Sequence, residues 1–390
     1  MEINIQNSFN KLLNYIESEN FKGYDPYDTL NSWVPFHWLG KWGPILATQF
    51  QKRNPINIRP LLGIKKDYNP KAMGLFLQAY SLLYAKTNKN EYLEKADYFF
   101  NWLKNNHYEG YSGYCWGYNF SWANSVKVIP KYYPSIVVTS FIIKGVYEYY
   151  LVTKNEESLN IIKSTSDYIL NNLPVTENEY GICFSYTDII KDTCFNASLL
   201  GAEVLAINFA ITGKKAFLQK AIKAVDFVLA YQEEDGRWNY SIDLNSDEED
   251  KQVDFHQGFV LESIRNILTL TKYTNSKYTN AILKGADFYY KEQTVDGKRL
   301  KYRWPKVYPI DIHNQAQAII TFVKLSPIEK KYLVYSRDIL IWTIDEMQNK
   351  KKGSFYYRKH KYLINKIPFI RWGQAWMLIA IASFLDKNKS

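Results

Sequence analysis

Six very apolar segments recur at nearly constant spacing along this chain, and each follows a loop rich in glycine and aromatic residues. Successive segments begin 57 to 64 residues apart, near residues 70, 134, 196, 256, 313 and 371. A period of this length indicates a repeated structural unit. The last segment, residues 374–385, is apolar on nearly every side but shorter than the ~18–20 residues that cross a membrane. Such segments are typical of helices buried at the centre of a large protein.

A second set of segments lies between these and is apolar on one side only. Residues 92–103 place apolar side chains at positions 93, 96, 99, 100 and 103, the spacing of a helix with one buried face. Segments 5–19, 158–173, 216–231, 278–293 and 329–348 share this pattern. Six inner and six outer helices in strict alternation predict an all-α fold, the (α/α)6 toroid. An open superhelix of helix pairs competes, but its repeats are usually ~34–47 residues long.

The repeat also predicts where a functional site lies. No linker-like composition interrupts it, so residues 1–390 are predicted to form a single toroid domain. Every inner helix follows an outer one, so the inner helices are parallel and their preceding loops converge on one face. These loops are rich in Phe, Trp and Tyr, which make up 17% of the chain. Such rings stack well on sugar faces, although they can also simply plug the end of a barrel. The predicted substrate-binding residues in these loops are Tyr114, Trp116, Trp238, Tyr240 and Tyr308.

An Asp-x-His element precedes two adjacent inner helices. Asp254 and His256 lie before the fourth, and Asp311 and His313 lie at the same point before the fifth. Capping of a helix amino terminus accounts for either Asp but for neither His. An Asp and a His at the rim of a cavity form a good acid/base unit. We therefore predict these four residues to be catalytic.

Three functions are compatible with these residues. Neighbouring helix axes lie ~8–10 Å apart, which suits two carboxylates, Asp254 and Asp311, in an inverting glycoside hydrolase with its ~6.5–9.5 Å separation. The histidines would then orient or tune the acids. Alternatively, a histidine and Tyr308 act as base and acid in a lyase or C5-epimerase acting on a uronic acid, with Arg371 or Asn314 neutralising the carboxylate. Finally, the site could bind a glycan during polysaccharide assembly without altering it.

The sixth inner helix begins with the segment Arg371-Trp372-Gly373-Gln374-Ala375-Trp376. Arg371 could clamp a carboxylate or sulfate, or pair with an Asp at the rim. Arg371, Trp372 and Asn314 are therefore also predicted to bind substrate. The net charge is +10, with basic residues gathered at 350–352 and 358–361 and an acidic run at 247–250. This mixed field favours an anionic glycan substrate. No recognised nucleic-acid-binding module is present, so no nucleic-acid partner is predicted.

Several short motifs resemble those of known proteins. The paired-helix repeat, the turn at 232–238 and the segment 371–376 resemble six-hairpin carbohydrate-active enzymes. Segment 371–376 is similar to the Arg-Gly-Gln-Ala-Trp segment of unsaturated glucuronyl hydrolases, but it has Trp372 inserted and lies in the final hairpin. Segments 113–118 and 254–259 resemble proteins encoded in capsule and exopolysaccharide loci. The resemblance implies a toroid that acts on polysaccharides or oligosaccharides, with hydrolysis favoured.

The remaining composition predicts neither a cofactor nor secretion. Cys115, Cys183 and Cys194 lack the spacing of a zinc site, so no metal or disulfide framework is predicted. The first residues carry neither the basic start nor the apolar run of a secretory signal. We therefore expect a cytoplasmic protein without a transmembrane segment. The oligomeric state is left open.

Overall fold

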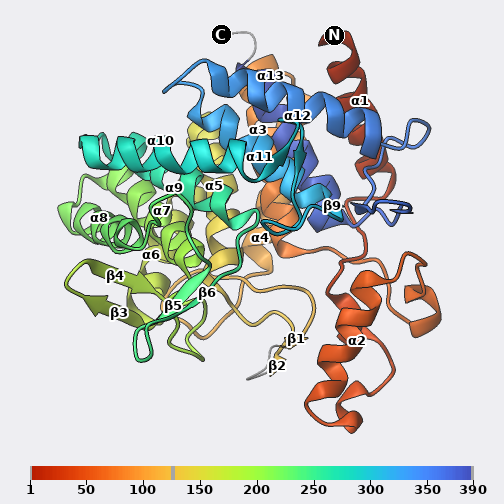
Figure 1. The fold of residues 1–390 in the computed structure, drawn as a ribbon, viewed down its shortest axis with the longest axis horizontal. Helices are drawn as coiled ribbons and strands as arrows, with labels where there is room; N and C mark the ends of the chain where they lie inside the picture. Colours follow the sequence, from red (N-terminus) through yellow and green to blue (C-terminus); the bar gives the residue numbers. More distant parts are fainter. Residues whose placement is uncertain (1, 124–127, 388–390) are drawn as a thin grey trace.

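The computed structural model describes residues 2–123 and 128–387, and within these ranges twelve helices form two concentric rings (Figure 1). The inner helices are α3 (Pro70–Thr87), α5 (Ile136–Thr153), α7 (Phe195–Thr212), α9 (His256–Thr271), α11 (Ile312–Leu325) and α13 (Trp376–Lys387). The outer helices are α1 (Glu2–Ser18), α4 (Asn90–Asn105), α6 (Glu156–Asn171), α8 (Lys215–Ala230), α10 (Ser276–Lys291) and α12 (Lys331–Met347). Each inner helix packs on the next, and α13 packs back on α3 to close the ring. The predicted (α/α)6 toroid is confirmed.

The inner helices are buried on all sides, as their composition requires. In α7 the first fourteen residues, 195–208, are all buried. Asn69 caps α3 by accepting hydrogen bonds from the backbone N–H groups of Lys71 and Ala72. Helices α3 and α5 approach through glycines, because a Cβ on Gly145 would lie 2.3 Å from the carbonyl oxygen of Gly74. In the part of the chain described, α5 and α7 are long and apolar enough to span a membrane, and 67% and 78% of their residues are buried inside the ring.

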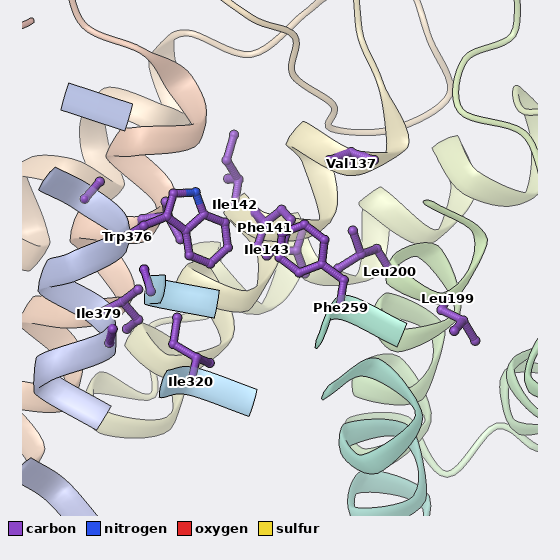
Figure 2. Close-up of a cluster of buried hydrophobic side chains, with 14 of the residues drawn as sticks. Val137, Phe141, Ile142, Ile143, Leu199, Leu200, Phe259, Ile320, Trp376 and Ile379 are labelled. Atoms are coloured by element: carbon purple, nitrogen blue, oxygen red, sulfur yellow. The ribbon is translucent and has the colours of Figure 1, made fainter. Parts of the chain in front are cut away.

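The centre of the ring holds an aromatic layer above a charged cluster. Phe141, Phe259 and Trp376 meet there from three alternate inner helices (Figure 2), with ring centroids 5.0 to 5.6 Å apart. Further along α5, the ammonium group of Lys144 lies 2.5 Å from Oε1 of Glu262 on α9 and 3.3 Å from Oε1 of Glu203 on α7. This Lys144 cluster joins α5, α7 and α9 through polar contacts inside an otherwise apolar lumen.

The loops from outer to inner helices form short antiparallel hairpins. They comprise β1 (Trp122–Ala123) with β2 (Val128–Ile129), β3 (Val175–Asn178) with β4 (Gly181–Phe184), β5 (Ser241–Asp243) with β6 (Glu248–Asp250), and β7 (Thr294–Val295) with β8 (Arg299–Leu300). A three-stranded sheet in the order β11-β10-β9 joins β9 (Ile310–Asp311), β10 (Arg358–Lys359) and β11 (Ile364–Asn365). The sheet brings the loop before α11 next to the loop before α13.

A repeated hydrogen bond anchors five of these loops to the inner helices. Near each helix start, one side-chain oxygen accepts a backbone N–H from the preceding loop at 2.6 to 3.0 Å. The acceptors are Thr139, Ser198, Gln257, Gln315 and Gln374, which recur every 58 or 59 residues. The glutamines also donate to loop carbonyl oxygens. These residues therefore hold the loops over the amino-terminal ends of the inner ring.

Two features of the fold differ from a simple alternation of helices. The sixth inner helix begins with a π-helical turn, Ile370–Ala375, which contains the Arg-Trp-Gly-Gln segment. An additional helix, α2 (Trp42–Arg53), lies between α1 and α3 and projects away from the rings at the lower right of Figure 1. Short 3-10 turns flank it at Asp28–Asn31, Phe36–Leu39 and Arg59–Leu62.

Candidate functional site

A cavity of about 620 Å³ lies where the inner helices begin. Every inner helix contributes a residue from its first turn, or from the turn just before it, to the wall: Lys71, Val137, Asn196, His256, His313 and Arg371. Residues Ile45, Thr48, Gln49 and Lys52 of α2 form part of the wall as well. The cavity volume is typical of small-molecule sites in proteins.

The structure brings together eight of the twelve residues proposed from the sequence as catalytic or substrate-binding. Those that line the cavity are Asp254, His256, Asp311, His313, Tyr240, Asn314, Arg371 and Trp372. The other four, Tyr114, Trp116, Trp238 and Tyr308, are not among its lining residues. The indole N–H groups of Trp116 and Trp238 instead donate to the carbonyl oxygens of Leu103 and Val228, near the ends of the outer helices.

For these four residues the expected position in the pocket is therefore corrected. Trp116 and Trp238 are almost fully buried, at 1% and 2% exposure, and they fix loops to outer helices. Tyr114 packs against His107 with ring centroids 4.2 Å apart. Tyr308 is half-buried against the core. Sequence reasoning placed these loops at the correct face but did not determine which rings turn inward.

Asp254 and His256 form a hydrogen-bonded dyad. Nδ1 of His256 lies 2.5 Å from Oδ1 of Asp254, and the second carboxylate oxygen accepts a hydrogen bond from Gln252 at 2.7 Å. Burial raises the pKa of Asp254, but the adjacent His256 outweighs it and the net pKa lies below the usual value. His256 is 19% exposed at its side chain, so its other ring nitrogen is available to a molecule in the cavity.

His313 has a different environment, one that holds it neutral. Its ring packs against Phe255 and Trp372, each with a centroid distance of 4.5 Å, and against Trp376 at 4.8 Å. Neither ring nitrogen has a hydrogen-bond partner among the described residues. Burial, followed by the charges of Lys71 and Arg371, lowers the pKa of His313 well below its usual value. The ring is therefore an uncharged base next to the cavity.

Asp311 is occupied by structural contacts. Its Oδ2 accepts from Nε of Arg358 at 2.6 Å, and its Oδ1 accepts from the Trp372 indole at 2.8 Å and from the backbone N–H of His313 at 3.0 Å. Both Asp311 and Arg358 are buried. The basic run at 358–361 is therefore not wholly solvated surface, since Arg358 lies inside the protein and neutralises Asp311.

Arg371 is likewise paired. Its Nε and Nη2 donate to the two carboxylate oxygens of Asp25, at 2.6 and 2.8 Å. Asp25 therefore occupies the two N–H donors of Arg371 that would otherwise bind a carboxylate or sulfate of the substrate. Asn314 donates to the carbonyl oxygens of Lys301 and Tyr302, so its amide nitrogen is also committed. Of the two open interpretations of Arg371, the structure therefore shows pairing with an Asp.

Two lysines line the cavity that sequence reasoning did not assign to the site. Nζ of Lys71 lies 4.0 Å from the centroid of the Phe141 ring and 5.2 Å from that of Trp376. Burial, aided by Arg371, lowers the pKa of Lys71 well below its usual value. Lys52 donates to the hydroxyl of Tyr27, and burial lowers its pKa to about 8. The sequence does indicate that Lys71 could belong to the site, because it lies at the start of an inner helix, at a position equivalent to those of His256 and His313.

Aromatic side chains form much of the remaining wall. They include Tyr27, Tyr118, Phe120, Tyr186, Tyr240 and Tyr302. The rings of Tyr118 and Phe120 stack with centroids 5.0 Å apart, and Tyr240 meets His256 edge-on at 4.8 Å. Burial raises the pKa of Tyr118, so its hydroxyl stays protonated and can donate a hydrogen bond. Apolar ring faces combined with polar tips suit a polyhydroxylated ligand.

The donor set does not resemble a metal centre. Within the described residues, no three His, Cys, Asp or Glu side chains are placed together to hold a metal ion. The three cysteines are buried free thiols.

Comparison with known proteins places the fold. No protein-family model matches the chain, and no curated protein matches it in sequence. Its structure is similar to that of cellobiose 2-epimerase from Bacillus thermoamylovorans, with a TM-score of 0.64, 17% identity, and coverage of 82% of this chain and 88% of that one. It is also similar to a GH76 α-mannanase of Bacteroides thetaiotaomicron (TM-score 0.63, 14% identity, 83% and 88% covered). A D-mannose isomerase matches with a TM-score of 0.61, 15% identity, and coverage of 82% and 87%.

These likenesses show a shared fold. The chain has the six-hairpin toroid of these carbohydrate-active proteins, in agreement with the resemblance seen in its motifs. At such low identity the fold carries no residue roles, so function has to be argued from the site itself.

Proposed function

We propose that this protein is a carbohydrate-active enzyme that moves a proton at a carbon atom of a sugar, as an epimerase or isomerase does. The observation that carries the proposal is the pair of imidazoles, His256 and His313, which begin neighbouring inner helices and line one cavity rich in aromatic side chains. Both rings lie against Phe255, with centroid distances of 4.1 and 4.5 Å.

The two histidines have complementary environments for this chemistry. Asp254 holds Nδ1 of His256 and stabilises the imidazolium that forms when the other nitrogen takes a proton. His313 is uncharged and able to accept a proton. In an open-chain sugar, a base removes the proton from the carbon beside the carbonyl group and leaves an enediolate. Return of a proton to the opposite face of that carbon gives the epimer. Return to the neighbouring carbon, with transfer of the hydroxyl proton from one oxygen of the enediolate to the other, gives the isomer.

The cavity also supplies groups that can stabilise the enediolate. Lys71 lies at the start of α3, and the protonated Tyr118 can donate a hydrogen bond from the wall. Two solved structures of the same fold are named as a cellobiose 2-epimerase and a D-mannose isomerase, which supports this class of reaction.

The glycoside hydrolase favoured by the sequence has weaker support from the geometry. An inverting hydrolase needs one carboxyl group that holds a proton for the leaving group. Asp254 has a lowered pKa, and both oxygens of Asp311 accept hydrogen bonds from Arg358, Trp372 and the backbone. The hydrolase stays the second candidate, because a GH76 α-mannanase has the same fold.

The substrate is proposed to be an uncharged sugar with a free reducing end. Two guanidinium groups of the wall, those of Arg371 and Arg358, are neutralised by Asp25 and Asp311 and so offer little to the predicted anionic glycan. Lys52, whose pKa is about 8, stays a cation in the wall, so an anionic sugar is the alternative substrate. The uronate lyase or C5-epimerase alternative also assigned the acid to Tyr308, which does not line the cavity.

The test is incubation with reducing disaccharides in deuterated water, followed by NMR and mass analysis. We expect deuterium at the carbon beside the carbonyl, with loss of this exchange in His256→Asn and His313→Asn variants. His107→Asn is the matched control, since His107 lies outside the cavity and packs on Tyr114. New reducing ends without deuterium would instead show a hydrolase. Bound sugar of unchanged mass without exchange would show the glycan-binding alternative.

A further inference from the structure

The segment between α1 and α3 exposes a group of large apolar side chains that no part of the described chain covers. We call Trp33, Trp38, Leu39, Trp42, Leu46 and Phe50 the Trp-rich surface. Their exposed fractions range from 55% to 80%, values unusual for residues of this size. Leu61, 78% exposed, adjoins Trp33, because the Trp33 indole donates to its carbonyl oxygen at 3.4 Å. Contiguous exposed apolar surface of this kind marks an interaction site.

The two faces of α2 differ sharply. Trp42, Leu46 and Phe50 recur at intervals of four residues and face outward, whereas Thr48 and Lys52 face the cavity. The 3-10 turn with Trp38 and Leu39 packs against the start of α2 and extends the outward face. Figure 1 shows α2 projecting beyond the helical rings, so its outward face points away from the toroid.

The charged residues within the segment that carries the Trp-rich surface all have one sign. Residues 29–66 contain six Lys or Arg residues and no Asp or Glu. Lys41, Arg53, Lys65 and Lys66 are exposed, and Lys66 pairs with Glu19 of α1. Nζ of Lys41 lies 5.5 Å from the centroid of the Trp42 ring, so a positive charge lies directly beside an exposed indole. Tryptophan and lysine together are the combination found where proteins meet the headgroup region of a bilayer.

We propose that the Trp-rich surface docks on an anionic lipid bilayer. Trp38, Leu39 and Phe50 enter the interface between headgroups and acyl chains, and Lys41 and Arg53 contact the anionic headgroups. Two copies of this chain facing one another would bring the exposed basic residues of the two segments together, which disfavours self-association through this site. Because the other face of α2 lines the cavity, docking brings the cavity near the lipid surface. The proposal is independent of the reaction catalysed.

Vesicle co-sedimentation of the full chain tests this docking. Vesicles of phosphatidylcholine alone are compared with mixtures of phosphatidylcholine and phosphatidylglycerol, at low and high salt. We expect the protein to sediment with the anionic vesicles and less so at high salt, because salt screens the headgroup contacts. Burying one large apolar side chain is equivalent to about tenfold or more in affinity. The Trp38→Ser/Phe50→Ser variant should therefore bind at least about tenfold more weakly.

Matched variants separate docking from general effects. Lys41→Glu/Arg53→Glu should weaken binding to anionic vesicles, while Leu151→Ser and Tyr180→Ser, which change exposed apolar residues elsewhere, should leave it unchanged. Circular dichroism checks that each variant is folded. The proposal is overturned if the wild type does not bind anionic vesicles, or if the Trp38→Ser/Phe50→Ser variant binds equally well. It is also overturned if sedimentation velocity shows a dimer that this variant dissociates, since a second copy would then be the occupant.

Discussion

The Lys144 cluster allows a direct test of how the inner ring is held together. Lys144 is 6% exposed and contacts Glu203 and Glu262 from two other inner helices. Glu262 also accepts a hydrogen bond from Gln317 at 2.8 Å, and Glu203 accepts one from Asn266 at 2.8 Å. The cluster therefore links α5, α7, α9 and α11 across the lumen, and its two carboxylates share the ammonium group of Lys144 as their counter-charge.

The substitution Lys144→Met keeps a straight side chain of similar length but removes the ammonium group. It leaves Glu203 and Glu262 as two buried carboxylates without their shared cation. Removing one partner from a buried ion pair costs about 3–5 kcal/mol. We expect the free energy of unfolding to fall by this amount at neutral pH.

The loss of stability caused by Lys144→Met should depend on pH. Burial raises the pKa of Glu203 in the wild type, although Lys144 opposes the rise. Without Lys144, the pKa of Glu203 in the folded state rises further, and the pKa of Glu262, which Lys144 holds below its usual value in the wild type, rises as well. The folded variant therefore binds protons that the unfolded chain releases. Its stability is then largest below the ordinary glutamate pKa and falls as pH rises through the raised values, by about 1.4 kcal/mol per pH unit and proton. The difference in the free energy of unfolding between the wild type and Lys144→Met should therefore become smaller as the pH is lowered from about 8 to about 5.

Urea unfolding, followed by circular dichroism and tryptophan fluorescence at both pH values, measures this difference. Lys144→Met/Glu203→Gln/Glu262→Gln removes all three charges and should recover most of the stability. The exposed pair of Lys104 and Glu157 provides the control, because Lys104→Met should cost less than about 1 kcal/mol. A loss in Lys144→Met that is below about 1 kcal/mol and constant with pH would refute the reasoning.

Three further predictions concern packing, the dyad and the thiols. Gly145→Ala should lower the free energy of unfolding by about 1–3 kcal/mol in urea titrations, because its Cβ meets the carbonyl of Gly74; an unchanged midpoint would contradict the close contact of α3 and α5. Asp254→Asn should lower kcat about 10²–10⁴-fold in the exchange assay with a smaller effect on KM, and equal activity would remove the dyad from the mechanism. Burial raises the pKa of Cys115 and of Cys194 to about 12, so in the folded protein both should resist iodoacetamide near neutral pH and react after unfolding in urea; rapid labelling of the native protein would contradict their burial.

Much of the site's frame could be predicted from the sequence. The first five starts proposed for the inner helices agree with the structure to within about two residues, and the sixth, near 371, falls in the π-helical turn that precedes α13. Gln257, Gln315 and Gln374 also recur in the sequence every 58 or 59 residues. That they bind the backbone of the preceding loops is seen only in the structure. The π-helical turn at Ile370–Ala375 and the projecting α2 lie outside the repeat, and its period could not predict them.

The sequence by itself determined the alternation of two kinds of helix, the closed ring and the face on which the site lies. These depend on local periodicity, since burial on one side or on all sides is visible within a single turn of each helix. Only the tertiary structure decided which polar groups are free. Arg371 pairs with Asp25, 346 residues away, and Arg358 pairs with Asp311, whereas both ring nitrogens of His313 lack partners among the described residues. The physical reason is that a side chain's partner depends on the direction in which packing turns it, and closure of the ring sets that direction.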